Sequence, residues 1–156
     1  MTARKNLFGE LMGRLTKVPI SGPDPDALVL AELRRLRDRV PGLTGSLVAS
    51  SDGLLVTHDL PEHIEPTGMA ALAAAQLSLS DRLAGTAHGG VFQAVVVDGS
   101  AGHVVIYAAG WAALTVLAGP EVNIGRLHLE CRPVARAIAE HLAVRSRQSG
   151  TTNARN

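Results

Sequence analysis

The stretch that decides the fold is residues 40–56, which read VPGLTGSLVASSDGLLV. Pro41-Gly42 at its start disfavours helix and ends any helix that precedes it. Behind it, the apolar triplets LVA and LLV flank the polar run SSDG. Asp52-Gly53 within that run supplies the positive φ angles of a tight hairpin turn. The stretch therefore predicts the end of a helix followed by two antiparallel strands.

A helix is predicted ahead of this stretch, over residues 24–40. Asp24 is a favourable N-cap residue, and Pro25 suits the first helical position because its missing N–H would have no helical partner there. The apolar residues expected to face the core recur at helical spacing: Val29, Leu33, Leu36 and Val40.

A second, alanine-rich helix is predicted over residues 66–83, after the polar loop 59–65. Its large apolar side chains share one helical stripe: Met69, Leu72, Leu79 and Leu83. Gly85 is expected to cap its C-terminus.

Three further strands are predicted over residues 91–97, 103–109 and 112–118, because β-branched and apolar runs alternate there with glycine-containing turns. The connections are too short for parallel crossovers, which take about a dozen residues or more, so the strands should form an antiparallel meander. A third helix follows, with Ile124, Leu127, Cys131, Ala135, Ile138 and Leu142 on its apolar stripe. Pro133 lies inside this helix, so a kink or break is expected near residues 129–132.

The order of elements predicts one α/β (α+β) domain over residues 24–144, with the arrangement α-β-β-α-β-β-β-α. Its core would be a single five-stranded antiparallel sheet with helices on its faces. Residues 1–23 form a basic N-terminal extension, with four cationic residues against one acidic residue, and residues 145–156 form a basic tail expected to be disordered. Since the whole chain carries +1, the intervening body is mildly acidic, which argues against nucleic-acid binding by the domain.

The composition points to a reducing, cytoplasmic setting. The 156 residues contain one cysteine, Cys131, so no intramolecular disulfide can form. The N-terminal apolar residues are interrupted by charges and glycines, unlike a signal-peptide core. The longest apolar stretch, residues 103–120, contains two glycines and falls short of the roughly 20 residues needed to span a bilayer, so no transmembrane segment is expected.

Residues that could carry catalysis or bind a metal are few. No glycine-rich phosphate-binding loop with a following lysine and serine or threonine is present. His58 and His63 flank a loop containing two acidic residues, but solvated loop residues explain this grouping better than a metal does. His128 with Glu130 and Cys131 resembles only half of a zinc-deaminase motif. We therefore expect no enzymatic activity, no metal and no cofactor.

The sequence resembles the Roadblock family of dynein light chains and bacterial GTPase regulators, which has a profilin/longin-like shape. The resemblance lies in the passage 40–56 and in AAGWAALTVL at residues 108–117, and it extends over residues 24–144. Members typically place a "G-V-x-G-a-x-l-x-s-x-D-G-l-x-l" pattern at the first passage. Similar small proteins occur in actinobacterial gene clusters beside a sensor kinase and a Ras-like GTPase.

This resemblance implies a homodimer in which strand 91–97 pairs with its copy and the second helices pack side by side. An exposed, apolar strand edge also invites such pairing on physical grounds. The implied interface residues are Val91, Gln93, Val95 and Val97, and Val95→Lys is expected to break the dimer. Bacterial members bind Ras-like small GTPases through the paired second helices, which implies partner-binding roles for Gly68, Ala71, Leu72, Ala75, Ser78 and Arg82.

Three alternatives remain open from the sequence, of which an unannotated hydrolase is the least favoured. The small residues of the second helix could instead pack on their own sheet. The domain could also be a small-ligand sensor of profilin, longin or PAS-like shape, although its aromatic content of 3% supplies such a pocket poorly. The leading prediction is a non-enzymatic homodimeric scaffold or regulator of a small GTPase.

Overall fold

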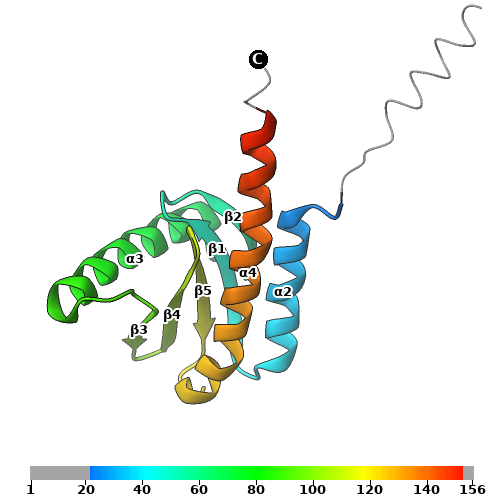
Figure 1. Cartoon of the computed structure of the whole chain (residues 1–156). Helices are drawn as coiled ribbons and strands as arrows, with labels where there is room; N and C mark the ends of the chain where they lie inside the picture. Colours follow the sequence, from blue (N-terminus) through cyan, green and yellow to red (C-terminus); the bar gives the residue numbers. More distant parts are fainter. Residues whose placement is uncertain (1–21, 153–156) are drawn as a thin grey trace, which may run out of the picture.

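One antiparallel sheet of five strands lies between two layers of helix in the computed structural model, which describes residues 22–152 (Figure 1). The elements are α2 (Pro25–Arg39), β1 (Leu43–Ser50), β2 (Leu55–Asp59), α3 (Pro66–His88), β3 (Ala94–Gly99), β4 (Gly102–Ala109), β5 (Ala112–Ala118) and α4 (Ile124–Thr152). This order and the antiparallel pairing confirm the predicted fold class.

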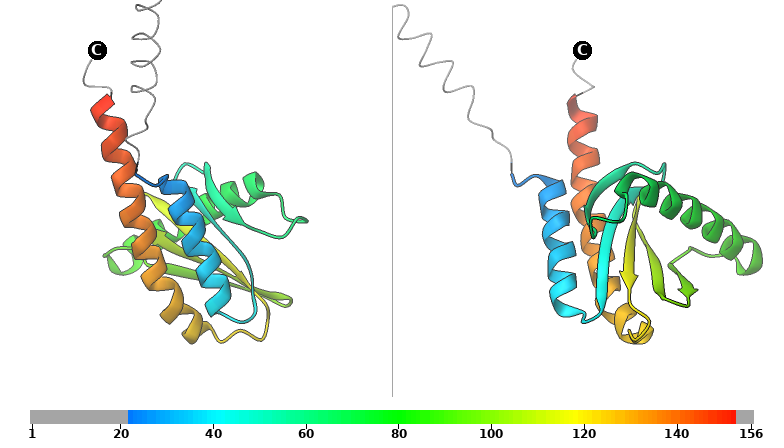
Figure 2. Two further views of the ribbon diagram at one scale, coloured as in Figure 1. Left: turned by 90° about the vertical axis from the view of Figure 1, so that its right-hand side faces the viewer. Right: turned by 180° about the vertical axis from the view of Figure 1, so that it is seen from behind.

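The helices α2 and α4 cover one face of the sheet, and α3 crosses the other (Figure 2). The predicted apolar stripes of α2 and α4 are buried, with Leu33, Leu36, Leu127 and Ile138 fully inaccessible. They pack on the inward-facing residues of the sheet, namely Val48, Val105, Tyr107, Leu114 and Val116. This larger core lies on the sheet face opposite α3.

The strand order is β2-β1-β5-β4-β3, which places β3 at one edge of the sheet with β4 as its only neighbour in the described chain. The expectation that this strand is left unpaired on one side is therefore confirmed. Its predicted start is wrong, because β3 begins at Ala94 and not at Val91. Gly89 and Gly90 both have positive φ and redirect the chain, so that Phe92 turns inward and is only 7% exposed.

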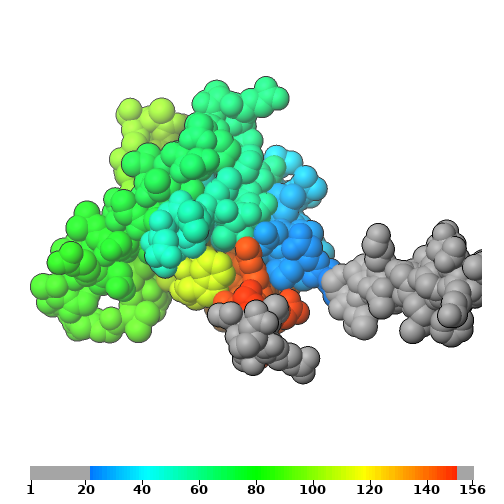
Figure 3. Space-filling view, turned by 90° about the horizontal axis from the view of Figure 1, so that it is seen from above, coloured from blue at the N-terminus to red at the C-terminus, as the bar shows by residue number. Residues whose placement is uncertain are grey.

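The helix α3 runs past the predicted cap, Gly85, and ends at Gly89, whose φ is 69°. It packs on the sheet through the alanines at positions 70, 73 and 74, since small side chains allow the helix to approach closely. Its leucines at positions 72, 79 and 83 are consequently not in the core, in contrast to what their helical stripe predicts. The C-terminal part of α3 extends beyond the strands (Figures 1 and 3).

The helix α4 is continuous through Pro133, so the expected break is absent. Because Pro133 has no N–H, the carbonyl of Leu129 four residues earlier has no helical donor. Both residues lie on the exposed side of the helix, where water can hydrate that carbonyl. The helix continues to Thr152, so the prediction of disorder is wrong for residues 145–152. Within this stretch the guanidinium of Arg145 forms an ion pair with the carboxylate of Asp26 in α2, with an N–O distance of 2.7 Å. The expectations for residues 1–21 and 153–156 lie outside the described residues.

The N-terminus of α3 gives a first testable prediction. The carboxylate of Glu65 accepts hydrogen bonds from the backbone N–H groups of Thr67 (2.9 Å) and Gly68. These bonds, with that from Gly68 the largest cause, hold the pKa of Glu65 below its ordinary value of 4.5. Glu65→Ala should therefore lower Tm by about 2–5 °C at pH 7.

The pH dependence of this effect follows from the lowered pKa of Glu65. The stabilisation is fully present above the unfolded-state pKa and is lost as the pH falls through the folded-state value. The Tm difference between wild type and Glu65→Ala, measured by circular dichroism, should shrink below about pH 4.5. Glu62→Ala, an exposed loop substitution three residues earlier, is the matched control and should show no such difference. A pH-independent difference would contradict the capping role.

Candidate protein-binding surface

The residues predicted to bind a partner all lie on the outer surface of α3. Every one of them is exposed: Gly68, Ala71, Leu72, Ala75, Ser78 and Arg82. The alternative that the small residues among them pack on their own sheet is wrong, because Ala70, Ala73 and Ala74 occupy that position. The predicted positions are thus available to another molecule.

An exposed leucine stripe adjoins these positions on α3. Leu72, Leu79 and Leu83 are 68%, 63% and 69% exposed. Leu72 also borders a groove of about 280 Å³ between α3 and the β3–β4 side of the sheet. The groove is lined by Met69, Leu72, Ala73, Gln76, Val97, Val104, Ile106 and Thr115, which makes it largely apolar.

The edge strand β3 borders the same groove. Gln93 O accepts a hydrogen bond from Ala108 N–H at 3.0 Å, in line with the register that pairs Val95 with Ile106. Since hydrogen-bonded pairs alternate along an antiparallel ladder, the N–H and C=O groups of Ala94, Val96 and Asp98 point away from β4. The outer side of β3 therefore presents main-chain donors and acceptors to a further strand.

The four residues predicted for the dimer interface are not equivalent in the structure. Val91 and Gln93 precede β3, so their predicted place in the strand is wrong. Val95 and Val97 lie in the strand and face the α3 side, opposite Ile106 and Val104. Val95 packs on a small core cluster beneath α3, whereas Val97 is 44% exposed.

We call the combined feature the α3–β3 surface: Leu72, Leu79, Leu83, Val97 and the outward main chain of β3. It joins an apolar helix face to an open strand edge on one side of the molecule. A contiguous apolar patch beside an unpaired edge is typical of a protein contact and is a liability when left uncovered.

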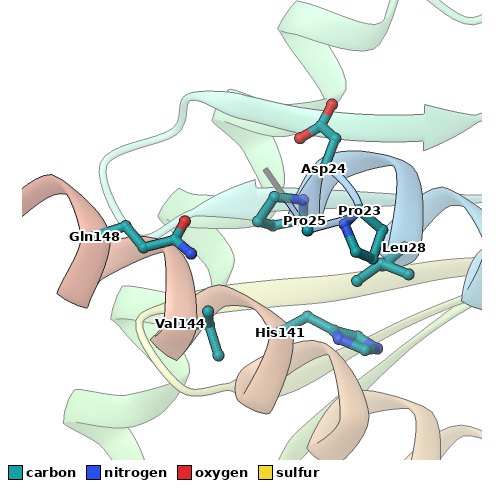
Figure 4. A pocket seen from close by; sticks show the side chains of 8 residues that line it. Pro23, Asp24, Pro25, Leu28, His141, Val144 and Gln148 are labelled. Atoms are coloured by element: carbon teal, nitrogen blue, oxygen red, sulfur yellow. The ribbon is translucent and has the colours of Figure 1, made fainter. Parts of the chain in front are cut away.

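A larger cavity lies elsewhere, between the start of α2 and the C-terminal half of α4 (Figure 4). It has a volume of about 690 Å³ and is lined by Gly22, Pro23, Asp24, Pro25, Leu28, His141, Val144 and Gln148. Asp24 is engaged as the cap of α2, and its carboxylate accepts from Asp26 N–H at 3.1 Å. His141 lies 3.9 Å from Glu32 of α2. These lining residues do not pair a nucleophile with a base.

The candidate metal and catalytic residues serve structural roles. Cys131 is fully buried, and burial raises the pKa of its thiol to about 12, so the thiol is protonated and unreactive. Glu130 turns instead to Arg39, 3.7 Å away. His58 Nδ1 accepts a hydrogen bond from Leu60 N–H, and Asp59 pairs with Arg37 at 3.0 Å.

The described part of the chain offers neither a metal site nor a membrane span. Residues 22–152 contain no group of three or more histidines, cysteines and acidic residues placed to hold a metal ion. No helix within those residues combines the length and apolarity needed to cross a membrane.

The fold and the α3–β3 surface together define a small three-layer α/β domain whose most distinctive feature is an exposed helix beside an open strand edge. The sequence profile of the Roadblock/LC7 domain matches residues 29–118, which run from within α2 to the end of β5. The chain belongs to the Roadblock/LC7 family.

Known proteins agree with this assignment. A crystal structure of a Roadblock/LC7 domain from Streptomyces avermitilis is 29% identical, with a TM-score of 0.67 over 72% of this chain and 96% of that one. The gliding protein MglB from Thermus thermophilus is 19% identical, with a TM-score of 0.67 over 78% and 93% of the two chains, and shows the shared fold. The uncharacterized protein MJ1340 of Methanocaldococcus jannaschii is 28% identical over 70% of this chain and 93% of its own.

Proposed function

We propose that this protein is a homodimeric scaffold or regulator that binds a Ras-like small GTPase in a signalling complex and has no catalytic site of its own. The observation that carries the proposal is the α3–β3 surface, where exposed leucines and an open strand edge need a protein partner. The bacterial Roadblock proteins that the sequence resembles bind such GTPases. The domain boundaries proposed are 24–144 for the Roadblock domain, with the segments on either side as extensions.

A second copy of the chain fits the β3 edge. Antiparallel pairing of two β3 strands would satisfy the outward N–H and C=O groups of Ala94, Val96 and Asp98 in both copies. The same two-fold arrangement would bring the two α3 helices together over the groove, covering Leu72 and Val97. The exposed leucines are then buried without any change to the fold of one chain.

The GTPase would bind the outer surface of the two paired helices. Gly68, Ala75 and Arg82 are exposed in the single chain and are therefore available to such a partner. Small residues there allow the close approach of a partner, and Arg82 adds a positive charge. We place the complex in the cytoplasm, because a single buried cysteine suits a reducing compartment. The family resemblance adds a sensor kinase as a further component.

Charge insertion on this outer surface tests the proposal. Ala75→Glu should weaken binding to the cognate Ras-like GTPase by at least about 10-fold, because the introduced carboxylate would be desolvated in the contact. Binding is measured by isothermal titration calorimetry against the Ras-like GTPases of the same genome, each loaded with GDP or a non-hydrolysable GTP analogue. Ala27→Glu, at an exposed alanine of α2 on the opposite layer, is the matched control.

The outcomes separate clearly. Loss of binding by Ala75→Glu with retention by Ala27→Glu supports the α3 surface. Equal affinities for the two variants exclude that surface, and wild-type protein that binds none of the GTPases in either nucleotide state excludes the proposed function. GTP hydrolysis by the bound GTPase, compared between wild type and Arg82→Ala, then distinguishes a regulator from a scaffold that only localises its partner.

A further inference from the structure

A second cavity lies on the sheet face opposite α3, and of the residues predicted for the two interfaces only Gln93 lines it. It has a volume of about 340 Å³ and is bordered by Phe92, Gln93, Tyr107, Ala108, Arg132, Ala135 and Arg136. Its walls come from α4, from β4 and from the segment between α3 and β3. We call it the Phe92 cleft.

The floor of the Phe92 cleft is apolar and uncharged. Phe92 and Tyr107 are 7% and 1% exposed, and Ala135 of α4 borders the same floor. The phenol of Tyr107 and Nδ1 of His128 are hydrogen-bonded at 2.9 Å. Burial raises the pKa of Tyr107 and lowers that of His128, so at neutral pH both partners of this hydrogen bond are uncharged.

The rim of the cleft is cationic. Arg132 and Arg136 lie one helical turn apart on α4, and both are exposed. Neither forms an ion pair with a carboxylate of the described chain, whereas Arg37, Arg39 and Arg145 each have one. Two uncompensated guanidinium groups above an aromatic floor are complementary to carboxylates that flank an apolar side chain.

Exposed apolar residues continue the site on both sides. Leu129 lies one turn before Arg132 on the same face of α4 and is 76% exposed, and Val91, next to Phe92, is 87% exposed. The cleft is near the lower end of the roughly 300–1,000 Å³ typical of small-molecule sites and is open to solvent. It therefore suits one anchoring side chain of an extended segment, with contacts spreading to Leu129 and Val91.

We propose that the Phe92 cleft binds an acidic segment of a partner protein, with one apolar side chain seated on Phe92 and Tyr107 and flanking carboxylates paired to Arg132 and Arg136. This site lies on the opposite layer from α3, so it can be occupied while the α3–β3 surface holds other proteins. The protein would then join two partners through two separate surfaces.

The test uses the full-length chain and a defined probe, the N-acetylated and C-amidated hexapeptide Glu-Asp-Leu-Phe-Asp-Glu. Titration to about 1 mM, followed by ¹⁵N–¹H NMR, should shift the amides of Gln93, Ala108 and Ala135 first. The uncharged peptide Gln-Asn-Leu-Phe-Asn-Gln should bind at least about 10-fold more weakly, and added salt should weaken the acidic peptide.

Charge-reversal variants test whether Arg132 and Arg136 bind the acidic peptide. The double variant Arg132→Glu with Arg136→Glu should lose acidic-peptide binding by at least about 10-fold. The double variant Arg34→Glu with Arg126→Glu changes the net charge equally at two exposed arginines outside the cleft and should retain it. All four arginines are exposed, so circular dichroism should show unchanged folds.

Four results would overturn the proposal. These are the absence of NMR shifts at about 1 mM peptide, shifts that cluster away from the cleft, equal loss of binding in the two double variants, or a cleft variant that alters only self-association. The last result would assign Arg132 and Arg136 to contacts between copies. None of them bears on GTPase binding at α3, which the Ala75→Glu comparison tests separately.

Discussion

Val97→Lys is expected to convert the proposed dimer into monomers while leaving the fold of each chain intact. Val97 is 44% exposed and borders the groove beside Leu72, so a lysine there can extend its ammonium group into water in the single chain. In the dimer the same ammonium would be buried against apolar side chains without a partner. The dimer dissociation constant should rise at least about 100-fold, or ~2.7 kcal/mol.

Light scattering at micromolar concentration checks this directly, since one chain has a mass of 16.3 kDa and the dimer twice that. Val97→Thr, which retains the size and shape of the side chain and adds no charge, is the matched control and should stay dimeric. A wild-type mass of one chain, or a dimeric Val97→Lys protein, contradicts pairing through β3. The substitution that the sequence favours, Val95→Lys, is less informative because Val95 packs beneath α3 in its own chain.

Proline substitutions in β3, which remove a backbone N–H donor, test whether the dimer forms through the main chain of this strand. Val96 N–H points to the open edge, so Val96→Pro removes a donor that only a second strand would use. Val95→Pro removes a donor directed at β4 and should unfold or loosen the chain instead. A folded, monomeric Val96→Pro protein beside a destabilised Val95→Pro protein would locate the contact at the main chain of β3.

The elements that the sequence predicts correctly are those whose burial follows one periodic stripe. In α2 and α4 the large apolar residues of the predicted stripes, such as Leu33 and Ile138, recur at helical spacing and are buried. The hairpin between β1 and β2 is likewise marked by Gly53, whose φ of 86° excludes most other residues, although the positive φ that the sequence predicts for Asp52 as well is wrong. In these segments local preference and tertiary packing favour the same structure.

The α3 helix has a leucine stripe and an alanine stripe, and either could be its buried face. Judged by side-chain size alone, the leucine stripe would be chosen, which is wrong. A stripe of large apolar residues ordinarily faces the core, yet the alanine stripe that includes Ala70 and Ala73 is the buried one. The sequence contains the correct signal, since alanines recur at core spacing along this helix. Nothing within residues 22–152 covers these leucines, and that discrepancy is the best indication of a binding partner.

The Phe92 cleft could not be predicted from the sequence because its residues come from separate segments. The sequence pattern assigns Phe92 to a strand, where alternation alone would decide its direction. The positive φ angles of Gly89 and Gly90 shift the strand start and bring Phe92 against α4. Arg132 and Arg136 are ordinary surface arginines in the sequence, and only their position above Phe92 distinguishes them.

The second large effect concerns Gly102, where the chain turns from β3 into β4. Its φ is +155°, and a Cβ added there would lie 2.5 Å from the carbonyl oxygen of Ala118, which is backbone and cannot swing aside. Gly102→Ala should therefore destabilise the protein by about 2 kcal/mol or more and lower Tm by roughly 5 °C or more. Thermal melting followed by circular dichroism measures this loss.

The same substitution at Gly85 is the control, and it should raise the free energy of unfolding where Gly102→Ala lowers it. Gly85 lies inside α3, and a Cβ added there would meet no atom of a neighbouring element within 4 Å, so Gly85→Ala should stabilise the helix by about 0.5–1 kcal/mol. Because Gly102 closes the hairpin that carries the open edge, Gly102→Ala should also speed amide exchange in β3 and weaken self-association, whereas Gly85→Ala should change neither. Equal stability of the two variants would mean that the β3–β4 turn relaxes away from Ala118, and the edge would then not depend on this glycine.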